Sequence, residues 1–595
     1  MNAYREARPR AARHRARPSL ETMEERLLLA ATELPAELQG QLLRSVWTAP
    51  RTAPVSPGGA VSAWPAQLPV SRSNLALRPD FGSVSGRFPW TASGPARFHP
   101  RPPYVTGPLI VVANRDLLAG VTTDQVASQP GTVFPRSQVE PYLAMNPLNA
   151  HMAVGVWQQD RWSDEGARAI GVAVTQDAGQ HWRTSLVPGL TLATGGTYQR
   201  ASDPWAAFSA DGRVLYVASL PFNNTNPDGT GGESAVAVSR SLDGGRHWDR
   251  PVLLDQQTSP SSQTDKDSIA TDPVKPRLAY SAWERLQIPL TLFPFRGPAM
   301  FSRTTDAGRT WKPARVLYDP GDNALTINHQ LFPRANGTLY DVFTMFRVTA
   351  LPPNPPAFQN HLTVLVSPDR GATWGNPIFG PELLGAPVIA PNSRAPLRTA
   401  STPSGFPAQF ASVAMDSRTS TLYAVWQDAR FSTDMSTPID RIVFSRSTDG
   451  GQTWSDPTPI NATPTAIPPL DQQAFVPAIQ VAGDGTIGVS YYDFRNNRPS
   501  ATGGLADAWM VFCPPGADPT LAASWGGEVR LTNHSFEIAQ APLTTGGVTG
   551  GGYFLGDYVG LGATGHAFQA FFSVTTGQTA TVVSRLVVPS WQRFH

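Results

Sequence analysis

Short apolar runs separated by polar turns recur along most of the chain. Two examples are the pair Asp203-Pro-Trp-Ala-Ala-Phe208 and Leu215-Tyr-Val-Ala218, and the pair Gln409-Phe-Ala-Ser-Val-Ala414 and Leu422-Tyr-Ala-Val-Trp426. Runs of about four to eight residues rich in Val, Tyr, Phe and Trp, bounded by turn residues, are typical of β-strands. The pattern therefore predicts an all-β fold of antiparallel strands joined by tight turns.

An eight-residue phrase, Ser/Thr-x-Asp-x-Gly-x-x-Trp, occurs five times among these runs. At a turn, the carboxylate can accept hydrogen bonds from nearby backbone N–H groups, and the Gly can adopt a positive φ. Because the phrase is used alike at every occurrence, we interpret its Asp residues as structural rather than catalytic or metal-binding. These residues are Asp177, Asp243, Asp306, Asp369 and Asp449.

This phrase resembles the Asp box, or BNR repeat, of the sialidase (neuraminidase) superfamily, and the resemblance covers roughly residues 110–595. It implies a sialidase-like β-propeller in which each box joins the third and fourth strands of a four-stranded antiparallel blade. Seven pairs of apolar runs supply first and second strands, so we expect seven blades, with six, the number in family sialidases, as the alternative. The run Gly107–Ala113 is expected to close the ring by pairing into the last blade.

The blade topology predicts which loops share a face. In an up-and-down blade, the turn between strands 1 and 2 and the turn between strands 3 and 4 lie at the same end. The 2–3 loops and the 4–1 connections between blades therefore gather at the mouth opposite the boxes. The long loops 286–298, 381–407 and 537–553 are expected to reach this mouth.

Acids and arginines are concentrated at the expected mouth. An aromatic residue followed by an acid and an Arg recurs at the ends of second strands, and further charged residues stand where first strands begin. The second-strand groups are Trp157…Asp160-Arg161, Trp283-Glu284-Arg285, Trp426…Asp428…Arg430 and Tyr492-Asp493…Arg495. The first-strand residues are Arg200, Asp203, Asp265, Asp267, His329, Asp557 and Tyr558.

These residue types suit recognition and hydrolysis of an acidic sugar. The planar guanidinium of Arg matches a carboxylate, and paired acids can provide acid–base catalysis on a glycosidic bond. The alternative is that each Asp–Arg pair is a structural ion pair that holds a loop between blades. Repetition favours the structural interpretation, so the residues outside the repeat are the sharper functional candidates: Arg136, Arg200, Asp557 and Tyr558.

Sialidases use three arginines on the substrate carboxylate, an Asp as acid/base, and a Tyr nucleophile assisted by a Glu. The resemblance implies Asp160 as the acid, Tyr558 as the nucleophile, and Glu284 or Glu140 as its partner, with Asp203 and Asp557 as further catalytic candidates. The segment Phe134-Pro-Arg136-Ser departs from the Phe/Tyr-Arg-Ile-Pro motif of the family. The predicted substrate-binding residues are Arg136, Arg161, Arg200, Arg285, Arg430 and Arg495.

Composition narrows the class of protein further. The basic excess lies in residues 1–135, which hold 15 Arg against 9 Asp and Glu, so the body is not a basic nucleic-acid binder. The single cysteine, Cys513, excludes an intrachain disulfide, and no apolar stretch is long enough for a membrane span. No cofactor is predicted; Ca²⁺ among the acid-rich loops is allowed, but no spacing specifies it.

Residues 1–31, which hold seven of the arginines, form a separate segment. Residues 1–31 are basic and end in an apolar run, Leu27–Ala31, that is too short for a secretory signal. They resemble the leader of many large exported bacterial proteins, which implies an extracellular or cell-surface location; the alternative is a disordered basic tail. Residues 32–105 read as a Pro/Ala/Ser-rich linker or disordered extension, and 106–595 as the propeller.

The sequence thus favours an exported, monomeric, sialidase-like propeller that hydrolyses acidic or surface glycans at the mouth opposite the boxes. A non-catalytic propeller that binds a glycan or a protein through the same face is the alternative. A third interpretation is an assembly factor whose mouth is structural, with every Arg paired to a loop acid.

Overall fold

The computed structural model describes residues 104–113, 115–124, 131–224, 232–259, 261–289, 294–350, 357–399, 409–434, 437–544, 552–577 and 579–589. The predicted leader, nearly all of the predicted linker, and parts of the three long loops lie outside these residues. Within them the regular structure is β-strand apart from four short 3₁₀-helices: Leu192–Thr194, Pro469–Gln472, Ala522–Ser524 and Ile538–Gln540.

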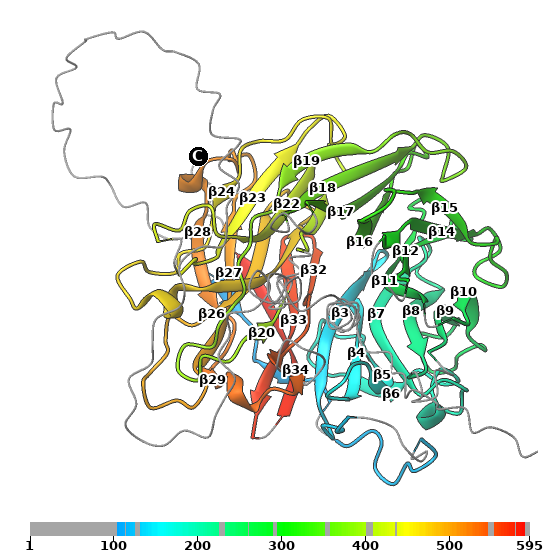
Figure 1. Ribbon diagram of the computed structural model, residues 1–595, viewed down its shortest axis with the longest axis horizontal. Coiled ribbons are helices and arrows are strands. Elements are labelled where there is room, and N and C mark those ends of the chain that lie inside the picture. Colours follow the sequence, from blue (N-terminus) through cyan, green and yellow to red (C-terminus); the bar gives the residue numbers. More distant parts are fainter. Residues whose placement is uncertain are drawn as a thin grey trace, which may run out of the picture.

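The strands pair in consecutive antiparallel groups of four, arranged around a central axis (Figure 1). We call each group a blade and name it by its innermost strand. The β3 blade comprises β3 (Gln138–Asn146), β4 (Asn149–Arg161), β5 (Ala167–Thr175) and β6 (Arg183–Leu186). The β7 blade comprises β7 (Arg200–Phe208), β8 (Leu215–Phe222), β9 (Ser234–Ser241) and β10 (Val252–Gln257). The β11 blade comprises β11 (Ser262–Thr271), β12 (Ala279–Gln287), β14 (Ala299–Thr304) and β15 (Arg315–Tyr318).

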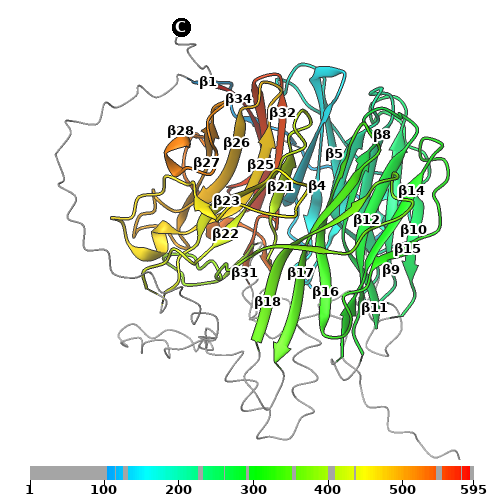
Figure 2. The same cartoon turned by 90° about the horizontal axis from the view of Figure 1, so that it is seen from above.

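The remaining blades continue the ring, and Figure 2 shows their sheets side by side from the edge. The β16 blade comprises β16 (Ala324–Pro333), β17 (Leu339–Ala350), β18 (Ala357–Ser367) and β19 (Ile378–Glu382). The β21 blade comprises β21 (Ser412–Met415), β22 (Leu422–Asp428), β23 (Arg441–Ser447) and β24 (Thr458–Pro459). The β25 blade comprises β25 (Ala474–Val481), β26 (Ile487–Asp493), β27 (Leu505–Cys513) and β28 (Gly526–Arg530). Short strands outside the blades are β13 (Arg296–Gly297), β20 (Leu397–Arg398), β29 (Phe536–Glu537), β30 (Leu543–Thr544) and β31 (Gly552–Phe554).

The last blade joins the two ends of the described chain. It comprises β32 (Gly560–Thr564), β33 (Ala567–Thr576) and β34 (Thr579–Pro589), and its outer edge is completed by β1 (Tyr104–Thr106) and β2 (Ile110–Val111). Both N-terminal strands run antiparallel to β34. The prediction that the run 107–113 closes the ring is thereby confirmed.

The core lies between neighbouring blades and is built around large aromatic residues. Trp157, Trp283 and Trp426 stand at the same place on the second strands of three blades, and each is fully buried. Burial of such a side chain contributes on the order of 2–3 kcal/mol. The close approach of the strands depends on Gly171, because a Cβ there would lie 2.2 Å from the Trp157 ring.

The five repeated phrases form the predicted turns between third and fourth strands. In the first, Gly179 N donates to Thr175 Oγ1 at 2.9 Å and His181 N donates to Asp177 Oδ1 at 2.9 Å. The other four repeat this arrangement around their Ser/Thr and Asp side chains. Ala178 N also donates to His151 O, beside the 1–2 turn of the same blade. The boxes therefore lie at the end of the ring where strands 1 and 2 are joined.

Candidate functional site on the propeller axis

The innermost strands share an irregularity at the same place. In β3, β7, β11, β16 and β25 the pairing register shifts near the start of the strand, which marks a β-bulge. One residue of each bulge has a positive φ. Residues other than glycine rarely adopt this backbone conformation, and it persists only where the surrounding structure enforces it. These residues are Glu140, Asp203, Lys266, Asn328 and Val476. The bulges re-aim side chains that regular strands would place elsewhere.

Three of the bulge side chains meet a fourth charged residue from the last blade. The Lys266 ammonium lies 2.6 Å from Asp203 Oδ1, 2.8 Å from Asp557 Oδ2 and 3.5 Å from Glu140 Oε1. All four side chains are at most 10% exposed. We call these four residues the axial cluster, because they come from the inner strands, or the segment just before one, of four blades.

Gly556 allows the last blade to approach the axis. Its φ is 131°, and a Cβ there would lie 2.7 Å from the Glu140 Cα. The adjoining Leu555 carbonyl accepts a hydrogen bond from Glu140 N at 3.1 Å. A glycine is therefore required just before Asp557 for that carboxylate to reach Lys266.

Three further carboxyl groups lie beside the axial cluster. Asp265 and Asp267 flank Lys266, and Glu284 pairs with Asp265 across β11 and β12. Asp267 and Glu284 are each 1% exposed, and neither oxygen of either carboxyl has a hydrogen-bond partner among the described residues. Because an unpaired buried charge is strongly unfavourable, these groups favour the protonated state.

The environment moves the pKa values of these acids in opposite directions. Burial, reinforced by Asp203, raises the pKa of Glu140 to about 7, and burial likewise raises that of Asp265 to about 7. Burial also raises the pKa values of Asp267 and Glu284 well above the ordinary range. Burial acts in the same sense on Asp557, but Lys266 and two guanidiniums outweigh it and hold its pKa below the ordinary value.

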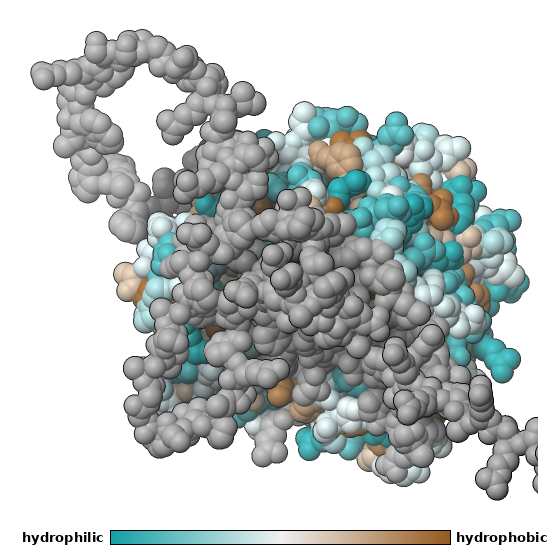
Figure 3. All heavy atoms as spheres, viewed as in Figure 1, coloured by the Kyte–Doolittle hydropathy of each residue, from teal (hydrophilic) through white to brown (hydrophobic). Residues whose placement is uncertain are grey.

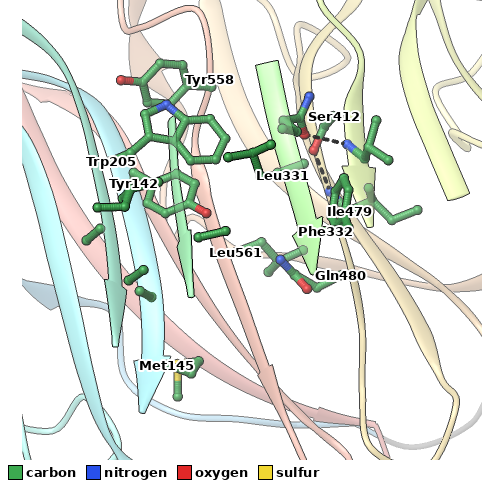
Figure 4. Close-up of a pocket in the computed structure, with 18 of the residues that line it drawn as sticks. Tyr142, Met145, Trp205, Leu331, Phe332, Ser412, Ile479, Gln480, Tyr558 and Leu561 are labelled. Carbon is green, nitrogen blue, oxygen red and sulfur yellow. Dashed lines mark hydrogen bonds between the residues drawn. The ribbon is translucent and has the colours of Figure 1, made fainter. Parts of the chain in front are cut away.

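A cavity of about 400 Å³ extends along the axis from the axial cluster. Asp557 and Tyr558 line it near the cluster, whereas Met145 and Pro147 line it near the 1–2 turns. Figure 4 shows Tyr142, Trp205 and Tyr558 grouped at one end of this cavity and Met145 apart from them. The cavity thus follows the axis toward the box end of the ring, whereas the sequence predicts the site at the mouth opposite the boxes.

Four of the predicted substrate-binding arginines pair with acids instead. Arg200 is fully buried, and its guanidinium binds the Asp164 carboxylate at 2.7 and 3.2 Å. Arg285 binds Asp255 in the same two-oxygen manner, Arg430 binds Asp428, and Arg495 binds Asp493 and Glu528. None of these arginines lines the axial cavity. The contacts of these four arginines are those of the structural ion pairs considered as the alternative.

The other predicted residues divide between the axis and the loops. Asp160 accepts hydrogen bonds from Arg136 N at 2.8 Å and from Gln159, and an ion pair joins it to Arg168 at 3.3 Å, so it holds a loop together. The Arg136 residue itself is exposed. Arg161 is buried near the axial cluster, where its guanidinium stacks on the Phe554 ring at 3.9 Å. His329 hydrogen-bonds to Asp341 and Thr326.

The sequence predicts that Asp203, Asp557 and Tyr558 lie together, and the structure brings them together. The sequence does not indicate Lys266, which contacts both carboxylates. Lys266 lies in a strand between two acids and matches no catalytic motif. A signal was present: the inner strands contain Glu140-Pro, Asp203-Pro and Val476-Pro. Proline inside a strand indicates an edge strand or a bulge, and the innermost strand of a blade is an edge strand that here also carries a bulge.

The described residues contain no group of three or more His, Cys, Asp or Glu side chains arranged to hold a metal ion. No helix among them is long and apolar enough to cross a membrane. The described surface visible in Figure 3 is mostly hydrophilic, with apolar residues scattered over it.

No family model and no curated protein matches the chain. Among solved structures, it is similar to an α-L-arabinofuranosidase of Fusarium graminearum, with 11% identity over 61% of this chain and 90% of that chain and a TM-score of 0.38. It is also similar to the sialidase of Trypanosoma rangeli (14% identity, 60% and 53% covered, TM-score 0.36) and to the intramolecular trans-sialidase of Ruminococcus gnavus (12%, 82% and 100%, 0.37). With TM-scores below 0.5, these likenesses assign no reaction to this chain.

Proposed function

We propose that the chain is a glycoside hydrolase whose reaction takes place at the axial cluster. One observation carries the proposal: Glu140 and Asp557 bind the same ammonium, and their pKa values are displaced in opposite directions. A carboxylic acid that keeps its proton near pH 7 beside a carboxylate that stays ionised is the arrangement that glycosidic bond cleavage needs. Glu140 would donate the proton to the leaving oxygen, and Asp557 would act as nucleophile or general base.

Tyr558 receives a different role from the one that the sialidase resemblance implies. Burial, reinforced by Glu140, Asp203 and Asp267, raises its pKa well above the ordinary value, so the phenolate that a nucleophile requires is disfavoured. Its ring forms part of the cavity wall, and its hydroxyl lies 3.4 Å from Pro204 O. We therefore assign substrate contact to Tyr558 and the nucleophile to Asp557.

The charge balance of the site also changes the proposed substrate. An acidic sugar would need arginines that are free to bind its carboxylate, but four candidates are paired with acids. Asp265, Asp267 and Glu284 add further carboxyl groups around the axial cluster. A sugar carboxylate would be repelled by Asp557, whose pKa stays below the ordinary value, so we propose a neutral sugar in place of the acidic one.

Turnover assays with nitrophenyl glycosides of neutral sugars, with a fluorogenic sialoside alongside, test the reaction. Glu140→Gln and Asp557→Asn should each lower kcat by about 10²–10⁴-fold, the usual contribution of a general acid or base. Asp319→Asn is the matched control and should leave kcat unchanged, because Asp319 is a partly exposed acid that pairs with Arg296. Turnover of the sialoside alone, or turnover that survives both substitutions, contradicts the proposal.

A non-catalytic glycan-binding propeller is the second candidate. It is favoured by Lys266, which already contacts three carboxyl groups and so neutralises much of the site without a ligand. Binding of a neutral oligosaccharide that is lost in Asp557→Asn, with no turnover of any glycoside, would support this candidate over the hydrolase. In either case we propose that the protein is exported, on the strength of the leader-like residues 1–31 alone, and that it is a monomer. N-terminal sequencing of the secreted protein tests the first point, and light scattering tests the second.

A further inference from the structure

We infer that the axial cavity binds an apolar group of the substrate, so that the preferred substrate is a glycoside of an aromatic or alkyl alcohol. The inference rests on the proposed function for its sugar part and on the cavity for its apolar part. The volume of the axial cavity, about 400 Å³, falls within the range of small-molecule sites. Three observations bear on the chemistry of its occupant: the use of the polar wall groups, the shape of the aromatic wall, and the position of Asp557.

The polar side chains in the cavity wall are largely used between blades. Asn328 Nδ2 donates to Ala411 O at 2.9 Å, and Gln330 both donates to Ala411 O and accepts from Val413 N. On the next interface Ser412 Oγ accepts from Ile479 N at 3.2 Å, a bond drawn in Figure 4. Groups that are satisfied across the blade interfaces offer little to a polar ligand, so the cavity favours an apolar one.

Three aromatic rings are grouped on one side of the cavity. The rings of Tyr142 and Trp205 lie 4.2 Å apart, and Tyr558 packs on them with centroid distances of 6.5 and 5.9 Å. The inner strands carry alanines farther along the cavity, at Ala144, Ala207 and Ala270. Flat rings at one end and small side chains beyond them leave a slot suited to a planar ring or a short alkyl chain.

The position of Asp557 connects this slot to the proposed reaction. Its carboxylate lines the cavity, and one of its oxygens binds Lys266 within the axial cluster. An apolar group in the slot therefore has its attachment point next to the proposed nucleophile. This is where the leaving alcohol of a glycoside would lie, and Glu140, the proposed acid, contacts the same ammonium as Asp557.

Direct binding of 2-naphthol, which contains no sugar, tests the cavity without requiring turnover. Calorimetric titration of the full chain should give one site, and Ala207→Trp should weaken binding at least tenfold by filling the slot. Ala466→Trp, at an exposed position, is the matched control and should bind as the unaltered protein does. If Ala207→Trp fails to fold, Ala144→Phe fills the same slot. No binding up to millimolar naphthol, or equal binding by the filled variant, overturns the inference.

A second measurement separates this inference from the proposed function. If the chain hydrolyses glycosides, the naphthyl glycoside should have a lower KM than the methyl glycoside of the same sugar, and Ala207→Trp should abolish that difference. Equal KM values for the two glycosides would overturn the apolar preference while leaving hydrolysis standing. Naphthol binding without turnover of either glycoside would support the cavity and contradict the hydrolase.

Discussion

The box end of the ring and the axial cluster use the same residue type in opposite ways. At the boxes, backbone hydrogen bonds from His181 and Thr373 help lower the pKa values of Asp177 and Asp369 to about 2. On the axis, burial raises the pKa of Asp265 to about 7. The box carboxylates are solvated and hold their turns as anions, whereas the axial ones are buried among other acids. Asp residues that repeat with the same partners serve the scaffold, and those that converge from different blades form the site.

The largest effect is expected from removing the central cation. Lys266→Met leaves Glu140, Asp203 and Asp557 buried without a counter-charge, which should lower the free energy of unfolding by about 3–5 kcal/mol near pH 8. The loss should shrink near pH 5, where protonation relieves the repulsion. Urea denaturation at both pH values measures it, with exposed Lys275→Met as the control. A loss equal to that of the control would show that Lys266 does not stabilise the buried carboxyl groups of the axial cluster.

The pH dependence of stability is expected to be next in size. Glu140 has a pKa of about 7 in the folded protein against an ordinary value of 4.5, so the folded state keeps a proton that the unfolded chain releases. Stability from this group is therefore complete below pH 4.5 and falls as the pH rises to about 7, by about 3 kcal/mol in all. Glu140→Gln should flatten this fall in a series of urea denaturation curves. An unchanged slope would show that Glu140 titrates normally.

The paired arginines should matter less, and only for stability. Arg430→Gln removes the two-oxygen contact with buried Asp428, so we expect a loss of about 2 kcal/mol with unaltered turnover. Arg418→Gln removes a similar contact in which the arginine is 49% exposed, and its loss should be below about 1 kcal/mol. Thermal denaturation of both variants ranks them. A drop in turnover for Arg430→Gln would show that this arginine contributes to substrate binding or catalysis.

The smallest effect is expected at a box. Asp306→Ala removes the acceptor of the Thr310 backbone and hydroxyl hydrogen bonds, which should cost about 1 kcal/mol because the turn is exposed and water can replace them. Turnover and naphthol binding should be unchanged. Loss of either activity in a variant that folds would contradict the structural interpretation of the boxes.

Much of the fold could be predicted because its signals are local. The strand pairs, the five turns and the closing N-terminal strand each follow from a few consecutive residues, and the structure contains all of them. The site was harder to predict because it depends on five bulges and on contacts between distant blades. Nothing in the residues next to Arg200 reveals that Asp164 occupies its guanidinium, and nothing next to Lys266 reveals that Asp557 reaches it. A periodic pattern predicts the strands but does not predict where the strands depart from it.

Ring closure has a consequence for how the protein is made. Lys266 and Asp557 are 291 residues apart in sequence, and Asp557 precedes the strand that begins the last blade. Until the ribosome has synthesised residue 557, Glu140, Asp203 and Lys266 have no fourth member, and until it has synthesised β34, β1 has no strand to join. A chain terminated before residue 557 would retain most of its blades yet lack this constellation, and under the proposed function it would be inactive.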